Sequence, residues 1–207
     1  MSNPFDHLSI IRKELSESPK NTEKFLTKIK DDLTNIESEL MFNISSLIKA
    51  GNTGSGVADK IEKFNLIDSI SEIHRVLAIY QGLTLKLRID IIPQSSRAFS
   101  DAKSTLSMEK TLFLGSETLI RYIPTISQRN SEMDYLFARA NKAFSDIDVI
   151  HKSVVSLINM VDEQVSYLNK LDSSIRLKFN IKNSGDFLDK VTSTVDTPMV
   201  RSADVDI

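Results

Sequence analysis

The feature that most constrains this chain is a long series of apolar residues whose spacing alternates between three and four. Such spacing places the residues along one side of an α-helix and is typical of helices that pack against other helices. At about 1.5 Å per residue, a helix over this series would be about 65 Å long, which predicts an elongated molecule. The series comprises Met133, Leu136, Ala140, Ala143, Ile147, Ile150, Val154, Leu157, Val161, Gln164, Leu168, Leu171 and Ile175.

Similar spacing predicts helices in the earlier part of the chain. The second predicted helix carries Leu26, Leu33 and Leu40 on its apolar stripe, with one polar interruption at Asn43. Pro93 is expected to end the third, because proline cannot continue the helical hydrogen-bond ladder. The first predicted helix covers 3–16, and the second begins between residues 18 and 22 and ends at residue 50. The other ranges are 57–91, 94–122 and 133–175, with Gly115 a weak point in the fourth helix.

A glycine-rich segment, Gly51-Asn-Thr-Gly-Ser-Gly56, separates the second and third predicted helices. Glycine adopts the left-handed backbone conformation at a helix end at little cost, which favours a tight turn. The two outer glycines have the spacing of a phosphate-binding loop. Val57 and Ala58 stand where that motif requires Lys and Ser or Thr, and no strand precedes the segment, so we interpret it as a turn.

These patterns predict an all-α fold, an elongated bundle of about five helices with long heptad-patterned, coiled-coil-like helices. We expect one helical domain over residues 1–179. After Phe179 the spacing stops, and Ser, Thr, Asp and Asn dominate. Residues 180–207 are therefore predicted to form a flexible C-terminal tail.

Composition narrows the classes of function. The 26 Lys and Arg nearly balance 28 Asp and Glu, without a basic block, which argues against a nucleic-acid partner. The absence of Cys excludes disulfides and thiolate chemistry. The N-terminus does not resemble a signal peptide, and no long apolar run predicts a transmembrane helix. We expect a cytoplasmic protein or a component of a large assembly, with membrane contact at most peripheral.

No set of residues forms a recognisable catalytic, cofactor or metal site. His7, His74 and His151 fall in different predicted helices, without the spacing that aims two ligands at one metal. Asp146, Asp148 and His151 could converge within two turns, but such groups are common on exposed helix faces. We therefore predict a non-enzymatic protein without catalytic residues, cofactor or bound metal.

The predicted functional surface is the apolar seam of the last helix. A polar residue within such a seam can fix the helix register and the number of partner helices. Alternatively, it can lie at the solvent-accessible edge of a bundle. Both interpretations apply to Asn43 and Gln164. The predicted partner-binding seam consists of Ile147, Ile150, Val154, Leu157, Val161, Gln164, Leu168 and Leu171.

The stretch from Ile147 to Ile175, with Gln164 at its centre, resembles the syntaxin-type SNARE motif and its central glutamine layer. The resemblance implies a membrane-fusion role through helix assembly. The chain departs from the motif at Lys178 and Lys182, which occupy later layer positions, and we expect neither a C-terminal membrane anchor nor a lipidated Cys.

The leading functional prediction is a helical interaction protein, a structural subunit or assembly factor that binds other helical proteins or itself. This prediction rests on the heptad-patterned surface, which exceeds what a monomer of this size needs for its own core. The alternative is a membrane-directed helical protein, either SNARE-like or a soluble subunit of a pore-forming assembly.

Overall fold

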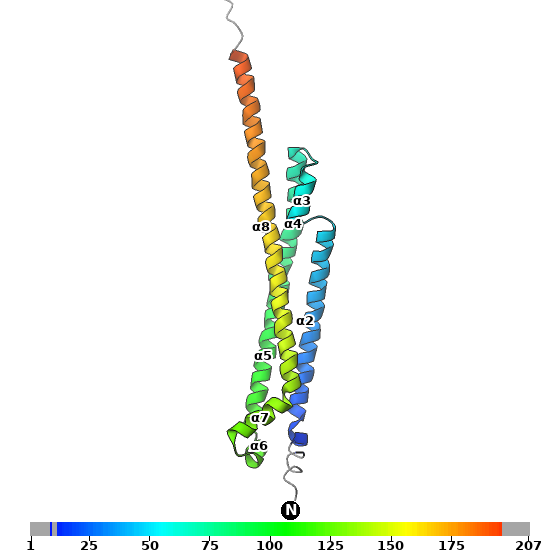
Figure 1. The fold of residues 1–207 in the computed structure, drawn as a ribbon, viewed down its shortest axis with the longest axis vertical. Helices are drawn as coiled ribbons and strands as arrows, with labels where there is room; N and C mark the ends of the chain where they lie inside the picture. Colours follow the sequence, from blue (N-terminus) through cyan, green and yellow to red (C-terminus); the bar gives the residue numbers. More distant parts are fainter. Residues whose placement is uncertain (1–8, 10–11, 196–207) are drawn as a thin grey trace, which may run out of the picture. The chain divides into compact units, whose positions relative to one another are not determined.

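The computed structural model describes residue 9 and residues 12–195, with side chains described up to residue 180. Of these described residues 91% are helical and none lies in a strand, which confirms the predicted all-α class. Coiled-coil packing of the helices stays a prediction. The elements (Figure 1) are α2 Glu17–Lys49, α3 Gly54–Ile61, α4 Leu66–Lys86, the π-helical segment η1 Leu87–Ile91, α5 Ile92–Leu114, α6 Glu117–Tyr122, α7 Ile126–Leu136 and α8 Ala138–Val195.

The chain forms two compact units rather than one continuous core. Unit 1 contains the chain up to Ala50 together with Gln81–Glu163. Unit 2 contains Gly51–Tyr80 and the described residues from Gln164 onward. The helices α4 and α8 each contribute to both units, so the predicted seam is divided between them at Gln164.

Unit 1 has an apolar core built from helices that are distant in the sequence. α2 and α5 run alongside each other in opposite directions, and the first part of α8 completes the packing (Figure 1). The rings of Phe113 and Phe137 meet edge to face, with 5.5 Å between their centroids. The buried core comprises Leu26, Leu33, Ala102, Leu106, Phe113, Leu119, Ile123, Phe137, Ala140, Ala143 and Ile147.

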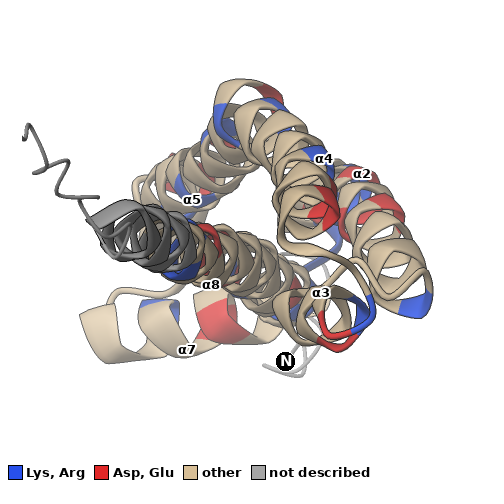
Figure 2. Cartoon of the chain, turned by 90° about the horizontal axis from the view of Figure 1, so that it is seen from above, with Lys and Arg blue, Asp and Glu red and all other residues tan. Residues whose placement is uncertain are grey.

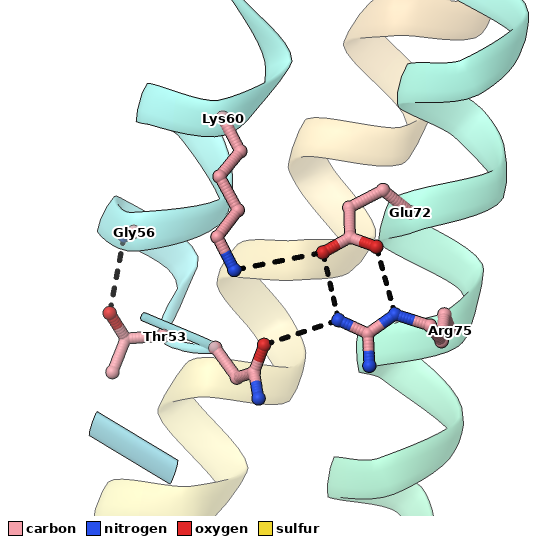
Figure 3. A network of polar contacts seen from close by, with 6 residues as sticks. Thr53, Gly56, Lys60, Glu72 and Arg75 are labelled. Atoms are coloured by element: carbon pink, nitrogen blue, oxygen red, sulfur yellow. Dashed lines mark hydrogen bonds and ion pairs between the residues drawn. The ribbon is translucent and has the colours of Figure 1, made fainter. Parts of the chain in front are cut away.

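Unit 2 begins with the glycine-rich segment, which forms the predicted turn. Gly51 has a left-handed φ of 66°, and the Thr53 hydroxyl caps α3 by accepting a hydrogen bond from the Gly56 backbone N–H at 3.2 Å. Figure 3 shows how polar contacts tie α3 to α4 beyond this turn: Glu72 pairs with Arg75 at 2.8 Å and with Lys60 at 3.8 Å. The side-chain hydrogen bond from Arg75 lowers the pKa of Glu72.

Three predicted helices are divided. The fourth is divided at its predicted weak point, where Gly115 and Ser116 separate α5 from α6. Residues 62–65 separate α3 from α4, and Asn65 accepts a hydrogen bond from the Asp68 N–H at 2.9 Å, as a helix N-cap does. Phe137 separates α7 from α8, so Met133 and Leu136 lie on a different helix from the rest of the predicted series. The Phe137 side chain is fully buried, so core packing holds the chain at this break.

Pro93 does not end a helix, contrary to the prediction. The turn before it is a π-helix, in which the Ile92 N–H bonds to the Leu87 carbonyl five residues earlier. Pro93 then stands in the first turn of α5, where its missing N–H is tolerated. The wider turn therefore lets α4, η1 and α5 follow one another directly.

The backbone of α8 continues through Val195, so residues 180–195 of the predicted tail are helical. Ser and Asn have helix propensities only a few tenths of a kcal/mol below those of good helix formers, so these residues can extend an established helix. Residues 196–207, like most of the first predicted helix, lie outside the described residues. The division into a helical domain over residues 1–179 and a flexible tail over residues 180–207 stays a prediction.

Candidate interaction surface

Half of the predicted seam is buried inside the chain. Ile147, Val154, Val161 and Leu168 are each at most 1% exposed, and they follow one another at intervals of seven residues. Ala140 and Ile175 extend the same series in both directions. These side chains belong to the interior of the folded chain and offer no surface to another molecule.

The other half of the seam, Ile150, Leu157, Gln164 and Leu171, is half-buried. In unit 2 the Gln164 Oε1 accepts a hydrogen bond from the backbone N–H of Gly54, the first residue of α3, at 2.8 Å. This bond satisfies a helix N–H that has no partner within α3. Gln164 therefore fixes α8 against α3, which favours the register interpretation for this residue. Asn43, the other polar seam residue, is half-buried.

The glycines of the turn are required by close contacts. A Cβ on Gly54 would lie 2.0 Å from Cδ1 of Tyr167, one turn of α8 from Gln164. A Cβ on Gly56 would lie 2.5 Å from the backbone oxygen of Gly51. A backbone atom cannot rotate away as a side chain can, so the contact at Gly56 is the stricter of the two.

We expect Gly56→Ala to lower the free energy of unfolding by about 1–3 kcal/mol, because the turn must open to admit the methyl group. Gly82→Ala is the matched control: Gly82 lies within α4, and its Cβ would have no neighbour within 4 Å. That change should raise stability by about 0.5–1 kcal/mol, since alanine favours the helix. Urea unfolding of both variants measures the difference, and equal shifts would show that the turn is not tightly constrained.

Unit 1 has an accessible, partly apolar groove between α2 and the η1–α5 segment. It has a volume of about 840 Å³. Phe25 from α2 is 43% exposed and Ile89 from η1 is 62% exposed. Half-buried Ile29 and Ala98 also contribute apolar surface. The lining consists of Phe25, Lys28, Ile29, Asp32, Ile89, Asp90, Pro93, Gln94, Arg97, Ala98 and Asp101.

The charged residues of this lining have no ion pair or side-chain hydrogen bond with other described residues. They are Lys28, Asp32, Asp90, Arg97 and Asp101. Charges just outside the groove behave differently: Lys86 pairs with Glu39 at 3.2 Å, and Arg88 pairs with Asp162 at 3.1 Å. The groove thus combines apolar side chains with unpaired charges of both signs.

A second hollow, of about 540 Å³, lies beside the first and shares Lys28 with it. It contains more cations than anions, and Arg139 approaches Glu23 to 4.0 Å. Figure 2 shows both basic and acidic residues on α2. The residues of this hollow are Lys20, Glu23, Lys24, Thr27, Lys28, Asp31 and Arg139.

Asp146 and Asp148, which could have converged with His151 on a metal ion, form ion pairs with lysines instead. Asp146 pairs with Lys30 at 3.1 Å, and Asp148 pairs with Lys152 at 2.6 Å. Within the described part of the chain, no three His, Cys, Asp or Glu residues are placed to hold a metal ion.

The two described histidines contribute to helix packing. His151 Nδ1 lies 2.8 Å from the hydroxyl of buried Ser95, and its ring stacks on Phe99 with 4.9 Å between centroids. His74 Nε2 lies 3.3 Å from Asp172 Oδ1, so it joins α4 to α8 within unit 2. His7 lies outside the described residues.

The α2–α5 groove was not identified from the sequence. Phe25 lies beside the heptad series of its helix rather than in it, and Ile89 lies in a segment whose apolar residues are interrupted by Arg88 and Asp90. Apolar residues four positions apart, such as Phe25 and Ile29, were the available signal. That signal does not show which second helix forms the other wall.

Comparison of the chain with protein-family models, with curated proteins and with solved structures gives no match. Among the described residues, none of the helices is both long and apolar enough to span a bilayer.

Proposed function

We propose that this chain is a non-enzymatic helical interaction protein, a structural subunit or assembly factor of a larger complex. It binds a helical partner through the groove between α2 and α5. The observation that carries the proposal is the combination, in one groove, of exposed apolar side chains with five unpaired charges.

The physical basis is the composition of protein interfaces. A central aromatic or aliphatic anchor surrounded by polar groups is the usual arrangement of a binding surface. Here Phe25 is the aromatic anchor, and the unpaired charges supply the polar surround. An amphipathic helix lying between two helices would bury Phe25 and Ile89 as a third layer of the bundle.

The polar residues that could have formed a metal site make structural contacts within the chain. Asp146, Asp148 and His151 each take part in contacts between or along helices, so each has a structural use. A SNARE-like role would require the amide of Gln164 to face partner helices. Its oxygen instead accepts from Gly54, so such a role would have to begin by breaking that bond.

The test compares two phenylalanines of α2 in the full-length chain. Phe25→Asp places a charge in the groove, whereas Phe42→Asp places one at a side chain that is 71% exposed and outside the groove. In affinity capture from the native source, Phe25→Asp should weaken partner binding by about 2 kcal/mol, roughly thirtyfold. Phe42→Asp should capture the same partners as the unmodified chain.

Circular dichroism of both variants shows whether the fold is retained. Equal capture by two folded variants would remove the groove from the proposal.

A further inference from the structure

We propose that the occupant of the α2–α5 groove is a second copy of this chain, packed groove to groove in antiparallel orientation about a two-fold axis. The inference rests on the proposed function and names its partner. It would be the contact of a symmetric dimer, in which the same surface of both copies is used.

The geometry of such a dimer follows from the antiparallel pair α2 and α5. The two-fold axis lies between the two copies and runs across the groove from the α2 side to the α5 side, at right angles to both helices. Rotation about it reverses the direction of each helix but keeps each helix on its own side of the groove. α2 therefore faces α2 of the second copy, and α5 faces α5, each pair running in opposite directions. The result is a four-helix arrangement of two layers.

The charges on α2 match this reversal. Lys28 precedes Asp32 by four residues, about one helical turn, and the two form no ion pair with each other. When the mate runs in the opposite direction, Lys28 of each copy faces Asp32 of the other. One surface thereby supplies two intermolecular ion pairs.

The charges on α5 repeat the pattern. Arg97 precedes Asp101 by four residues, again without an ion pair between them. The same two-fold operation brings Arg97 of each copy towards Asp101 of the other. Since both walls carry a cation followed by an anion at the same interval, the groove is complementary in charge to its own reversed copy.

The apolar part of the groove favours the same occupant. The half-exposed Phe25 of each copy, together with Ile29 and Pro93, would become buried against the second copy. A net charge of −2 gives little long-range repulsion between copies. Asp90 lies outside the paired positions, at the η1 end of the groove.

The test is sedimentation equilibrium of the full chain over a range of concentrations. The unmodified chain should be a dimer. Lys28→Glu should raise the dimer dissociation constant by about tenfold or more, because it faces Asp32 of the mate at two places. The double variant Lys28→Glu/Asp32→Lys should restore the dimer, since opposite signs again meet.

Lys24→Glu is the matched control, because Lys24 lies one turn earlier on the same helix and does not line this groove. It should leave the dissociation constant unchanged. Phe25→Asp should give a monomer that remains helical by circular dichroism.

A chain that is monomeric at all concentrations would overturn the inference. So would a dimer that Lys28→Glu and Phe25→Asp do not weaken, or one that the double variant fails to restore. If the chain is monomeric but Phe25→Asp still loses a captured protein that Phe42→Asp retains, the proposed function stands and only the identity of the partner is wrong.

Discussion

Val154→Asp should unfold unit 1 or prevent its folding. Val154 is fully buried within α8, and an unpaired carboxylate at that place has no water or cation to replace its hydration. The change removes the apolar burial of the valine and adds the penalty for a buried charge. We expect a loss of about 4 kcal/mol or more, a large share of the total stability of a domain.

The control is the next residue, Val155, which is 39% exposed. Val155→Asp makes the same chemical change and has the same effect on helix propensity, but its carboxylate reaches water. We expect a loss below about 1 kcal/mol. Urea unfolding followed by circular dichroism measures both variants. Similar midpoints for the two would show that the buried series of α8 is not a core.

Phe137→Ala should cause the second-largest loss of stability. This side chain is fully buried at the break between α7 and α8, and its ring contacts Phe113 edge to face. Truncating a buried phenylalanine costs about 3–5 kcal/mol through lost burial and the cavity that remains. The aromatic pair itself contributes about 0.5–1.5 kcal/mol of that value.

Phe42→Ala is the control for this change, because Phe42 is largely exposed on α2. Its effect should stay within about 0.5 kcal/mol. Phe113→Ala and the double variant complete a thermodynamic cycle. Full additivity of the two single losses would contradict a direct contribution from the ring contact, even if each loss is large.

The sequence predicted the long helices well because helical periodicity depends on geometry alone. Leu26, Leu33 and Leu40 are buried as their spacing on α2 requires. Periodicity did not distinguish the two halves of the α8 seam, since both Val154 and Leu157 satisfy the same three-four rule. Only the neighbouring helices make one series buried and the other half-buried.

The breaks within helices were harder to predict, for two different reasons. Asn65 had a recognisable signal, an N-cap residue with Asp68 in the following turn, which the continuous apolar spacing outweighed. Phe137 had none, because phenylalanine is compatible with a helix and its position is set by contact with Phe113. The π-helical turn before Pro93 likewise depends on the surrounding packing rather than on a local motif.

The groove could not be predicted because its walls come from segments about 60 to 70 residues apart in the sequence, around Phe25 and Ile89. Local spacing shows that each side chain is apolar, and it does not show that they share one hollow. Gln164 was recognised as unusual, but its partner Gly54 could be identified only from the folded chain.

The buried series of α8 also has a consequence for how its neighbours in unit 1 are shaped. A straight α-helix turns short of two full revolutions in seven residues, so a line through every seventh residue drifts by about 20° per step. From Ala140 to Val161 this amounts to about 60° in the left-handed sense. The segments that bury these side chains must follow that drift. Either one neighbouring helix coils around α8, or different neighbours cover successive parts of the line. A single straight helix parallel to α8 would leave one end of the line uncovered.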